Sequence, residues 1–386
     1  MSRFFKSGTI LENFNIKETR RQTMENNHTD RRYPVSLILV IVILLLLEGT
    51  SRLLFTGPAD ESVPGKELRK VGEANRLRES DDFLWEFTPN SVSTMGDHRV
   101  IINSMGFRDD EIPVEKAPGE FRIICLGDSL YFGEGIRLKN TFYQVLETKL
   151  QKKFPDRMIN VIGCGVPGYS SLQSYRQLKI KGLLLDPDVV LIGSLWSDNN
   201  RDYFTDKAEL RKATVKKNLH KSRFYFTLKR FFFAPMKQVL KLDPKQVKLQ
   251  PMGDMESLNQ RVSVKDYEKT LKKMADLCRD RNIMAVFLIA PHEFDVGIWR
   301  HHSPRPLPGE PLAWDDYRNA MRRIAKERGC LLLDLAKVFK DIFETEDRLL
   351  LQDYMHPDNQ GHEVMADHIL KNLLNLPGGP LRTENK

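Results

Sequence analysis

The chain has 386 residues, of which 41% are hydrophobic and 29% charged, and its formal net charge is +8. This composition is ordinary for a folded protein, and the lack of low-complexity tracts and of fixed-period repeats excludes a disordered chain and a solenoid. The length allows either one large core with insertions or two modest domains.

The first distinctive element is an uncharged apolar segment at residues 34–47, preceded by seven Lys or Arg residues. A helix continued past Glu48 to Phe55 reaches the roughly 20 residues that span a bilayer. The preceding basic residues favour a cytoplasmic N-terminus. We therefore predict a basic cytoplasmic tail over 1–33, a single-pass anchor of the cytoplasmic membrane over 34–55, and a periplasmic remainder. A buried core helix and a signal-peptide core are the alternatives.

The next region, residues 56–118, is rich in proline, glycine and charge. It contains two β-like runs, at 83–87 and at 98–108, and the second alternates apolar and polar residues. We predict a tether followed by a small β-rich pre-domain.

From Phe121 onward, strand and helix patterns alternate. The pattern predicts strands at 121–126, 158–162, 189–192, 284–290 and 330–334, and helices near 140–154, 171–183, 264–280, 314–328 and 361–374. Repeated strand–helix–strand units indicate an α/β fold with three layers, α/β/α, around a central, mostly parallel sheet. This domain is predicted to cover 119–376, and a tail follows at 377–386. The four cysteines form no Cys-x-x-Cys pair, so buried free thiols are expected.

An insertion at about 201–262 interrupts this alternation. Between Asp206 and Lys248 there are 13 Lys or Arg residues against 3 Asp or Glu, a net charge of +10, and an aromatic run occupies 224–233. A solvated insertion packed on the core is one interpretation, and a helix resting on anionic lipid is the other. The predicted periplasmic location argues against nucleic acid as a partner.

The residues that could perform chemistry lie at opposite ends of the α/β region. Ser129 follows the first predicted strand in a Gly-Asp-Ser turn, where a hydroxyl can attack an ester. Far along the chain, His356 could act as its base, and Asp353, three residues earlier, could orient that base. Pro357 disfavours helix at His356, so the pair is expected on a loop ahead of the final helix.

These motifs resemble the SGNH, or GDSL-type, hydrolase family. Residues 127–130 read Gly-Asp-Ser-Leu, and 353–357 read Asp-Tyr-Met-His-Pro. Residues 163–169 look like the family's second block, and the resemblance implies that the backbone N–H of Gly168 binds the oxyanion. The run 103–108 looks like a pre-domain of bacterial membrane-anchored members. No metal and no cofactor are implied.

The third block departs from the family pattern of Gly-x-Asn-Asp, whose Asn side chain is implied to be an oxyanion donor. Counting along the strand places Ser197 and Asp198 in that register, and Asn199 follows. We expect Asn199 to donate if the loop is shifted, with the Ser197 hydroxyl as the positional match. Gly163 and Gly165 are expected only to form a tight turn.

The resemblance covers about 119–376 and implies an esterase that cleaves O-acyl esters of carbohydrate or lipid through an acyl-Ser129 intermediate. Two alternatives remain open at this stage. One is an O-acyltransferase that uses the same three side chains, and the other is a non-catalytic scaffold or binding protein of the same fold, suggested by the altered third block. The oligomeric state cannot be read from the sequence.

Overall fold

The computed structural model describes residues 32–54, 69–70, 76–222, 224, 259–298, 313–376, 379 and 381. The backbone contacts divide the chain into two compact units, Met1–Ser62 with Lys216–Lys248, and Val63–Val215 with Leu249–Lys386. Most of the predicted cytoplasmic tail, much of the tether and nearly all of the aromatic run at 224–233 lie outside the described residues.

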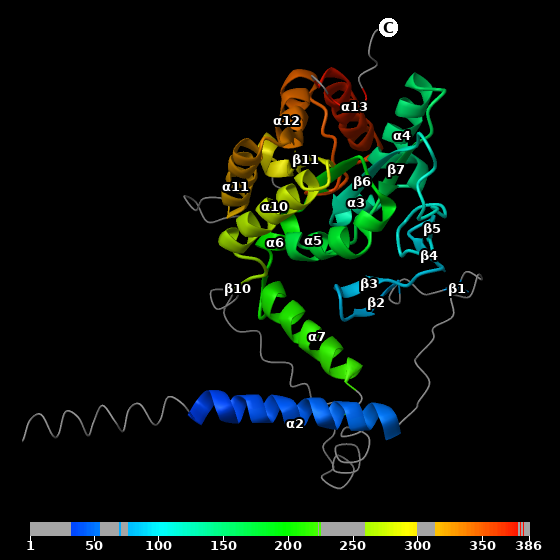
Figure 1. Ribbon diagram of the computed structural model, residues 1–386. Coiled ribbons are helices and arrows are strands. Elements are labelled where there is room, and N and C mark those ends of the chain that lie inside the picture. The colour runs from blue at the N-terminus through cyan, green and yellow to red at the C-terminus, as the bar shows by residue number, and fades with distance from the viewer. Residues whose placement is uncertain are drawn as a thin grey trace, which may run out of the picture. The chain divides into compact units, whose positions relative to one another are not determined.

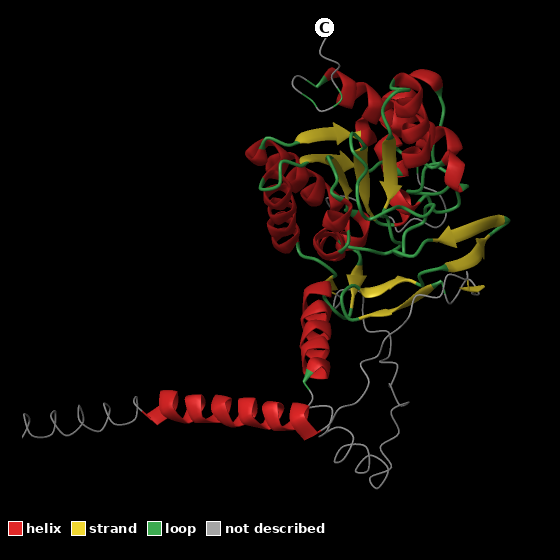
Figure 2. Ribbon diagram, turned by 45° about the vertical axis from the view of Figure 1, so that its right-hand side comes forward, coloured by secondary structure: helices red, strands yellow, loops and turns green. Residues whose placement is uncertain are grey.

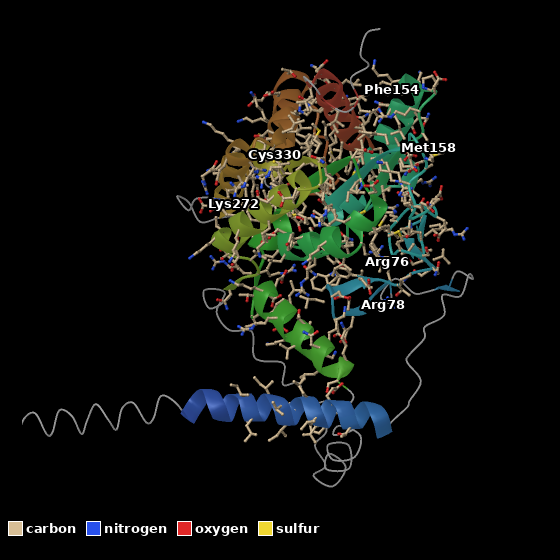
Figure 3. The ribbon with its side chains drawn as sticks, in the orientation of Figure 1. Arg76, Arg78, Phe154, Met158, Lys272 and Cys330 are labelled. Carbon is tan, nitrogen blue, oxygen red and sulfur yellow. The ribbon has the colours of Figure 1, made fainter. Side chains whose placement is uncertain are left out.

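The second unit is built on a five-stranded sheet in which all neighbouring strands are parallel (Figure 1). In spatial order the strands are β12 (Leu331–Asp334), β11 (Met284–Ile289), β8 (Val189–Gly193), β6 (Phe121–Gly127) and β7 (Ile159–Gly163). Every residue of β6 and β8 is buried, as expected for central parallel strands covered on both faces. Figure 3 labels Met158 and Cys330, which precede the two outer strands and mark the amino-terminal edge of the sheet.

Helices cover both faces of this sheet, which confirms the predicted α/β class (Figure 2). One layer contains α5 (Ser171–Ile180), α10 (Val264–Arg279) and α11 (Ala313–Arg328), and the other contains α4 (Phe142–Lys153), α12 (Leu335–Glu346) and α13 (Asn359–Asn375). The chain runs from β6 to β7 in one direction and from β7 through β8 to β12 in the other. Right-handed crossovers then place α4 on the face opposite α5, α10 and α11.

Local sequence explains these helices well. At the start of α10, the Ser263 side chain accepts a hydrogen bond from the Asp266 N–H and caps the helix. Along α10, Tyr267, Leu271 and Met274 are buried at helical spacing against the sheet, while the intervening lysines face outward. The position of the helix follows from this pattern of apolar and basic residues.

The predicted pre-domain forms two small β elements, a hairpin and a three-stranded sheet. The hairpin pairs β2 (Leu77–Ser80) with β3 (Leu84–Phe87), and the sheet contains β1 (Arg69–Lys70), β4 (Ser91–Met95) and β5 (His98–Ile102). Their buried side chains pack with Phe132, at the end of a short helix after β6, and with Val166 and Tyr169 of the loop after β7. The β elements therefore share a core with the carboxyl-terminal edge of the large sheet.

Three short elements and one longer helix lie in the segment around the insertion. They are α6 (Trp196–Asn199), β9 (Arg201–Asp202), α7 (Asp206–Lys221) and β10 (Asn259–Gln260), and β9 pairs with β10 in antiparallel fashion. The neck of the insertion is thereby closed. Of the cysteines, three are buried and Cys330 is half-buried, and all four are free, as expected.

The first unit contains α2 (Arg32–Leu54), which covers the predicted anchor. Its large apolar side chains from Ile38 to Leu47 are between 38% and 66% exposed. In the part of the chain that the structure describes, no helix is both long enough and apolar enough to cross a membrane.

Candidate active site

The candidate nucleophile lies where the order in which strands are added to the parallel sheet reverses. β6 is flanked by β7 on one side and β8 on the other, so its carboxyl end is the topological switch point of the sheet. Directly after β6, the Asp128 side chain accepts a hydrogen bond from the Leu130 N–H and starts the short helix α3 (Ser129–Phe132). Ser129 is therefore the first helical residue at that edge.

The loop before α13 brings the candidate base to Ser129. His356 Nε2 lies 2.8 Å from Ser129 Oγ, and His356 Nδ1 lies 2.6 Å from Asp353 Oδ2. The other Asp353 oxygen accepts the N–H groups of Met355 and His356 at 2.9 and 2.8 Å. The three residues thus form one continuous hydrogen-bonded chain, although 227 positions separate Ser129 from His356. The predicted loop conformation is confirmed, because residues 351–358 are not helical.

Burial and charge oppose each other in this group. Burial alone would lower the pKa of His356, but the hydrogen bond and the charge of Asp353 raise the pKa above its usual value. Burial would raise the pKa of Asp353, and the hydrogen bond and charge of His356 lower it instead. Both shifts favour a carboxylate facing an imidazole that becomes charged readily, which is what a general base requires.

Glycines seat α3 directly on the end of the sheet. A Cβ on Gly193 would lie 1.7 Å from the Tyr131 ring, and one on Gly127 would lie 2.2 Å from it. Tyr131 is fully buried, and its hydroxyl donates to the Leu288 carbonyl of β11 at 3.3 Å. The Tyr131 ring therefore holds the turn that carries Ser129, and it fits there only because positions 127 and 193 are glycines.

The interpretation of Gly163 and Gly165 as a tight turn is wrong. Gly163 belongs to β7, and a Cβ there would lie 2.5 Å from the Tyr143 ring. A Cβ on Gly165 would lie 2.4 Å from the backbone at Tyr131 and Phe132. Neither glycine has a positive φ, so close approach of neighbouring atoms is what requires them.

Gly168 lies on the loop that follows β7. This loop runs beside the end of β6, because the Val166 N–H donates to the Gly127 carbonyl at 3.1 Å. Gly168 has φ +77°, a left-handed conformation that suits glycine. Within the described residues, its N–H and that of Ser129 donate to no protein acceptor. Both amides are therefore available to a ligand at this edge.

The third block forms α6, in which Ser197 is buried and Asn199 is half-buried. In α6 these residues are two positions apart, so their side chains point about 200° apart and only one can face Ser129. The Ser197 N–H faces the Asp128 carboxylate, the neighbour of Ser129. Burial raises the pKa of Asp128 to about 6. Asp198 turns the other way, and its carboxylate accepts the Ser171 N–H at the start of α5.

An aromatic cluster beside these residues escaped the sequence analysis. It consists of Trp196, His292, Phe294, Trp314 and Tyr354, whose ring centroids lie 4.2 to 5.6 Å from their neighbours in the cluster. Tyr354 lies between Asp353 and His356 in the chain, and Trp196 precedes Ser197. The position of His292 just past β11 was the available signal, since ligand sites lie at such strand ends. The described residues contain no group of three or more potential metal ligands.

The chain is similar to solved structures of GDSL-family proteins and acetyl xylan esterases. A G-D-S-L family protein from Desulfitobacterium hafniense is 16% identical with a TM-score of 0.40 over 65% of this chain and 99% of that one. The acetyl xylan esterase AlAXEase is 17% identical with a TM-score of 0.44 over 66% and 100%. Axe2 from Geobacillus stearothermophilus, also an acetyl xylan esterase, is 16% identical with a TM-score of 0.42 over 69% and 100%. No family model and no curated protein matches the chain.

Proposed function

We propose that this protein is a serine esterase of the SGNH type. The observation that carries the proposal is the continuous chain of hydrogen bonds from Ser129 Oγ through His356 to Asp353, at 2.8 and 2.6 Å. Nucleophile, base and orienting carboxylate in this order are the machinery of acyl transfer.

The proposed reaction has two steps. As Ser129 Oγ bonds to the ester carbonyl carbon, its proton passes to His356 Nε2, and Asp353 stabilises the imidazolium. The N–H groups of Ser129 and Gly168 donate hydrogen bonds to the oxyanion, with Ser197 as third donor. The ester C–O bond then breaks, and the departing alcohol takes the proton from Nε2. Water, deprotonated by the same nitrogen, then attacks the acyl carbon. The acyl-Ser129 bond breaks, Ser129 Oγ takes the proton from Nε2, and the acid is released.

We propose an acylated carbohydrate as the substrate, because of the aromatic cluster. Trp314, Phe294 and Tyr354 are half-buried, and Tyr354 stands between Asp353 and His356 in the chain. Trp196 is only 6% exposed, and its Nε1 has no acceptor in the described part of the chain. Ring faces suit the C–H faces of a sugar. The acetyl xylan esterases among the structural neighbours act on esters of this kind.

The carbohydrate proposal has its own test. Trp314→Ala should lower kcat/KM for an acetylated oligosaccharide at least tenfold while leaving that for 4-nitrophenyl acetate within a factor of two. Tyr203→Ala, at an exposed residue outside the cluster, serves as the control. Equal losses for both esters in Trp314→Ala would exclude a sugar-binding role.

We also propose that residues 34–55 anchor the protein in the cytoplasmic membrane with the enzyme on the periplasmic side, and that the basic insertion contacts anionic lipid. The uncharged run at 34–47 and the net charge of +10 between 206 and 248 support this. Within the first unit, Ser222 Oγ donates to Glu48 at 2.6 Å, which joins the insertion to α2. Alkaline extraction of membranes tests whether residues 34–55 anchor the protein. A C-terminal alkaline phosphatase fusion tests whether the enzyme lies on the periplasmic side. Release at high pH, or an inactive fusion, would overturn the respective part.

A fluorophosphonate probe tests the catalytic proposal directly. We expect the wild type to react and Ser129→Ala not to react, while Ser263→Ala, at the cap of α10, reacts like the wild type. A folded wild type that does not react would leave the non-catalytic scaffold as the better interpretation. Product analysis with added sugar acceptor then separates water from a sugar hydroxyl as acyl acceptor, because only a transferase yields more acyl sugar as the acceptor concentration rises.

A further inference from the structure

The peptide groups on both sides of Gly168 accept hydrogen bonds from side chains that lie outside the five-stranded sheet. On one side, Trp85 Nε1 of β3 donates to the Pro167 carbonyl at 3.1 Å. On the other, Arg261 Nη1, at the neck of the insertion, donates to the Gly168 carbonyl at 2.8 Å. The two donors belong to segments 176 positions apart in the chain, and the sequence analysis selected neither of them as a site residue.

The Trp85 contact fixes the direction of the Gly168 N–H. In a trans peptide the C=O of one residue and the N–H of the next point in opposite directions. Because the Pro167 carbonyl points to Trp85, the Gly168 N–H must point away from it. The hairpin is secured in turn by the Tyr169 hydroxyl, which donates to the Trp85 carbonyl at 2.7 Å.

The Arg261 contact fixes the following peptide group. The Arg261 side chain is 7% exposed, and it bonds the carboxylate of the fully buried Asp206 through Nε at 2.9 Å and Nη2 at 2.7 Å. Nη2 also reaches Gln173 Oε1 at 3.1 Å. A planar guanidinium engaged on this many sides has little freedom to follow a moving carbonyl. The Arg261 guanidinium therefore restrains the direction of the Gly168 carbonyl.

Backbone bonds make Arg261 part of the insertion neck. Its N–H donates to the Asn200 carbonyl at 2.8 Å, and its carbonyl accepts the Asp206 N–H at 2.9 Å. The Val262 N–H donates to the Asp198 carbonyl at 3.1 Å. The neck thus connects the third block to the Gly168 loop.

Glycine needs such external support, because nothing in its own side chain limits rotation of the flanking peptides. We propose that Trp85 and Arg261 are positioning residues that hold the Gly168 N–H in the orientation required to bind the oxyanion. This proposal rests on the proposed esterase function. It assigns to the β2–β3 hairpin and to the insertion neck a shared role in catalysis, although neither contributes a group that touches the substrate.

The test removes each contact with the smallest available change. Trp85→Phe keeps a ring but lacks the Nε1–H, and Arg261→Gln shortens the side chain and removes its charge. The matched control is Arg176→Gln, because Arg176 also links the hairpin to α7, donating to the Asp82 carbonyl at 2.9 Å and to Thr214 Oγ1 at 2.6 Å, without touching Gly168. All variants are made in the full chain and compared at a temperature where each is fully folded.

Loss of one oxyanion donor costs about 10² to 10³ in rate, and we expect misdirection of a donor that remains present to cost about 10 to 10² in kcat. The KM for 4-nitrophenyl acetate should stay within a factor of two, and the acid limb of the pH profile should not move, because the triad is intact. A boronic acid that mimics the tetrahedral state should bind more weakly in proportion to the loss in kcat/KM. Arg176→Gln should retain kcat even if its melting temperature falls equally.

The proposal is overturned if Trp85→Phe and Arg261→Gln keep kcat to the extent that Arg176→Gln does, or if their losses track the fraction unfolded. In that case wild-type turnover that disappears in Ser129→Ala would still support the esterase. A wild type with neither turnover nor fluorophosphonate labelling would overturn the esterase and the positioning role together.

Discussion

Replacing Asp353 by Asn tests the orientation of the candidate base most sharply. In the native loop, one Asp353 oxygen accepts two backbone N–H groups and the other faces His356 Nδ1. The Asn carbonyl oxygen can keep the backbone bonds, and its NH₂ group then faces Nδ1 and donates to it. His356 is forced to carry its proton on Nε2, where it can no longer accept the proton of Ser129.

The magnitude follows from the exposure of the carboxylate. The loss of an orienting Asp in such a triad costs about 10⁴ in kcat. The Asp353 side chain is 43% exposed, so water can replace part of its effect, and we expect a loss of about 10³, or about 4 kcal/mol of transition-state stabilisation. Since Asp353 raises the pKa of His356, the acid limb of kcat/KM should also shift to lower pH in the variant.

The assay is hydrolysis of 4-nitrophenyl acetate between pH 5 and 9, with Asp358→Asn as control. Asp358 lies on the same loop but caps α13 by accepting the Gly361 N–H at 2.7 Å, and an Asn there can still accept that N–H, so stability and kcat should both stay close to those of the wild type. An Asp353→Asn enzyme that keeps more than a tenth of its kcat, or whose acid limb moves to higher pH, would refute this reasoning.

Three further outcomes follow from the structure. Ser197→Ala should lower kcat about 10-fold to 10²-fold, whereas Asn199→Ala should leave it within a factor of two, and the reverse result would favour the shifted loop that the sequence suggested. Gly193→Ala should lower the free energy of unfolding in urea by about 3 kcal/mol or more, because its Cβ would overlap the Tyr131 ring, and a smaller effect would mean that α3 is not seated as described. Burial lowers the pKa of His362 to about 3, so the free energy of unfolding should fall as the pH is lowered from about 6.5 towards 3. The slope should reach up to about 1.4 kcal/mol per pH unit, and His362→Asn should remove it. Equal slopes in the wild type and the variant would contradict this.

The regular elements of the α/β body could be predicted from the sequence because each carries its own periodicity. The strand expected at 121–126 is β6, and the helix expected near 264–280 is α10, with boundaries within one residue. α3 could not be found in this way, since four residues that continue an apolar strand show no helical period. α12 was also missed, although its apolar residues recur at helical spacing and Asp334 caps it. The sequence analysis predicted a strand at 330–334 but placed no helix directly after it.

The candidate site likewise has residues that could be predicted from the sequence and residues that could not. Ser129, Asp353 and His356 stand in short motifs, and the structure brings them within hydrogen-bonding distance. Trp85 and Arg261 stand in no catalytic motif, because their proposed role depends on contacts between segments that only the folded chain creates. The direction of one N–H group is likewise a property of peptide planes, which residue types alone do not determine.

The polar groups buried at the carboxyl edge of the sheet show what assembling the site from loops costs. Burial raises the pKa of Asp198 to about 8, even though the N–H and the hydroxyl of Ser171 both donate to it. The guanidinium of Arg108 is buried as well, and it donates to three carbonyls, that of the last residue of α3 and two in the segment that follows it. Apolar residues could have covered this edge without such desolvation, but they could not have fixed the direction of backbone carbonyls. The sheet supplies the burial that holds the fold, while these costly polar contacts orient the loops on which Ser129, Gly168 and His356 lie. Losing one of them should therefore affect turnover at least as much as stability.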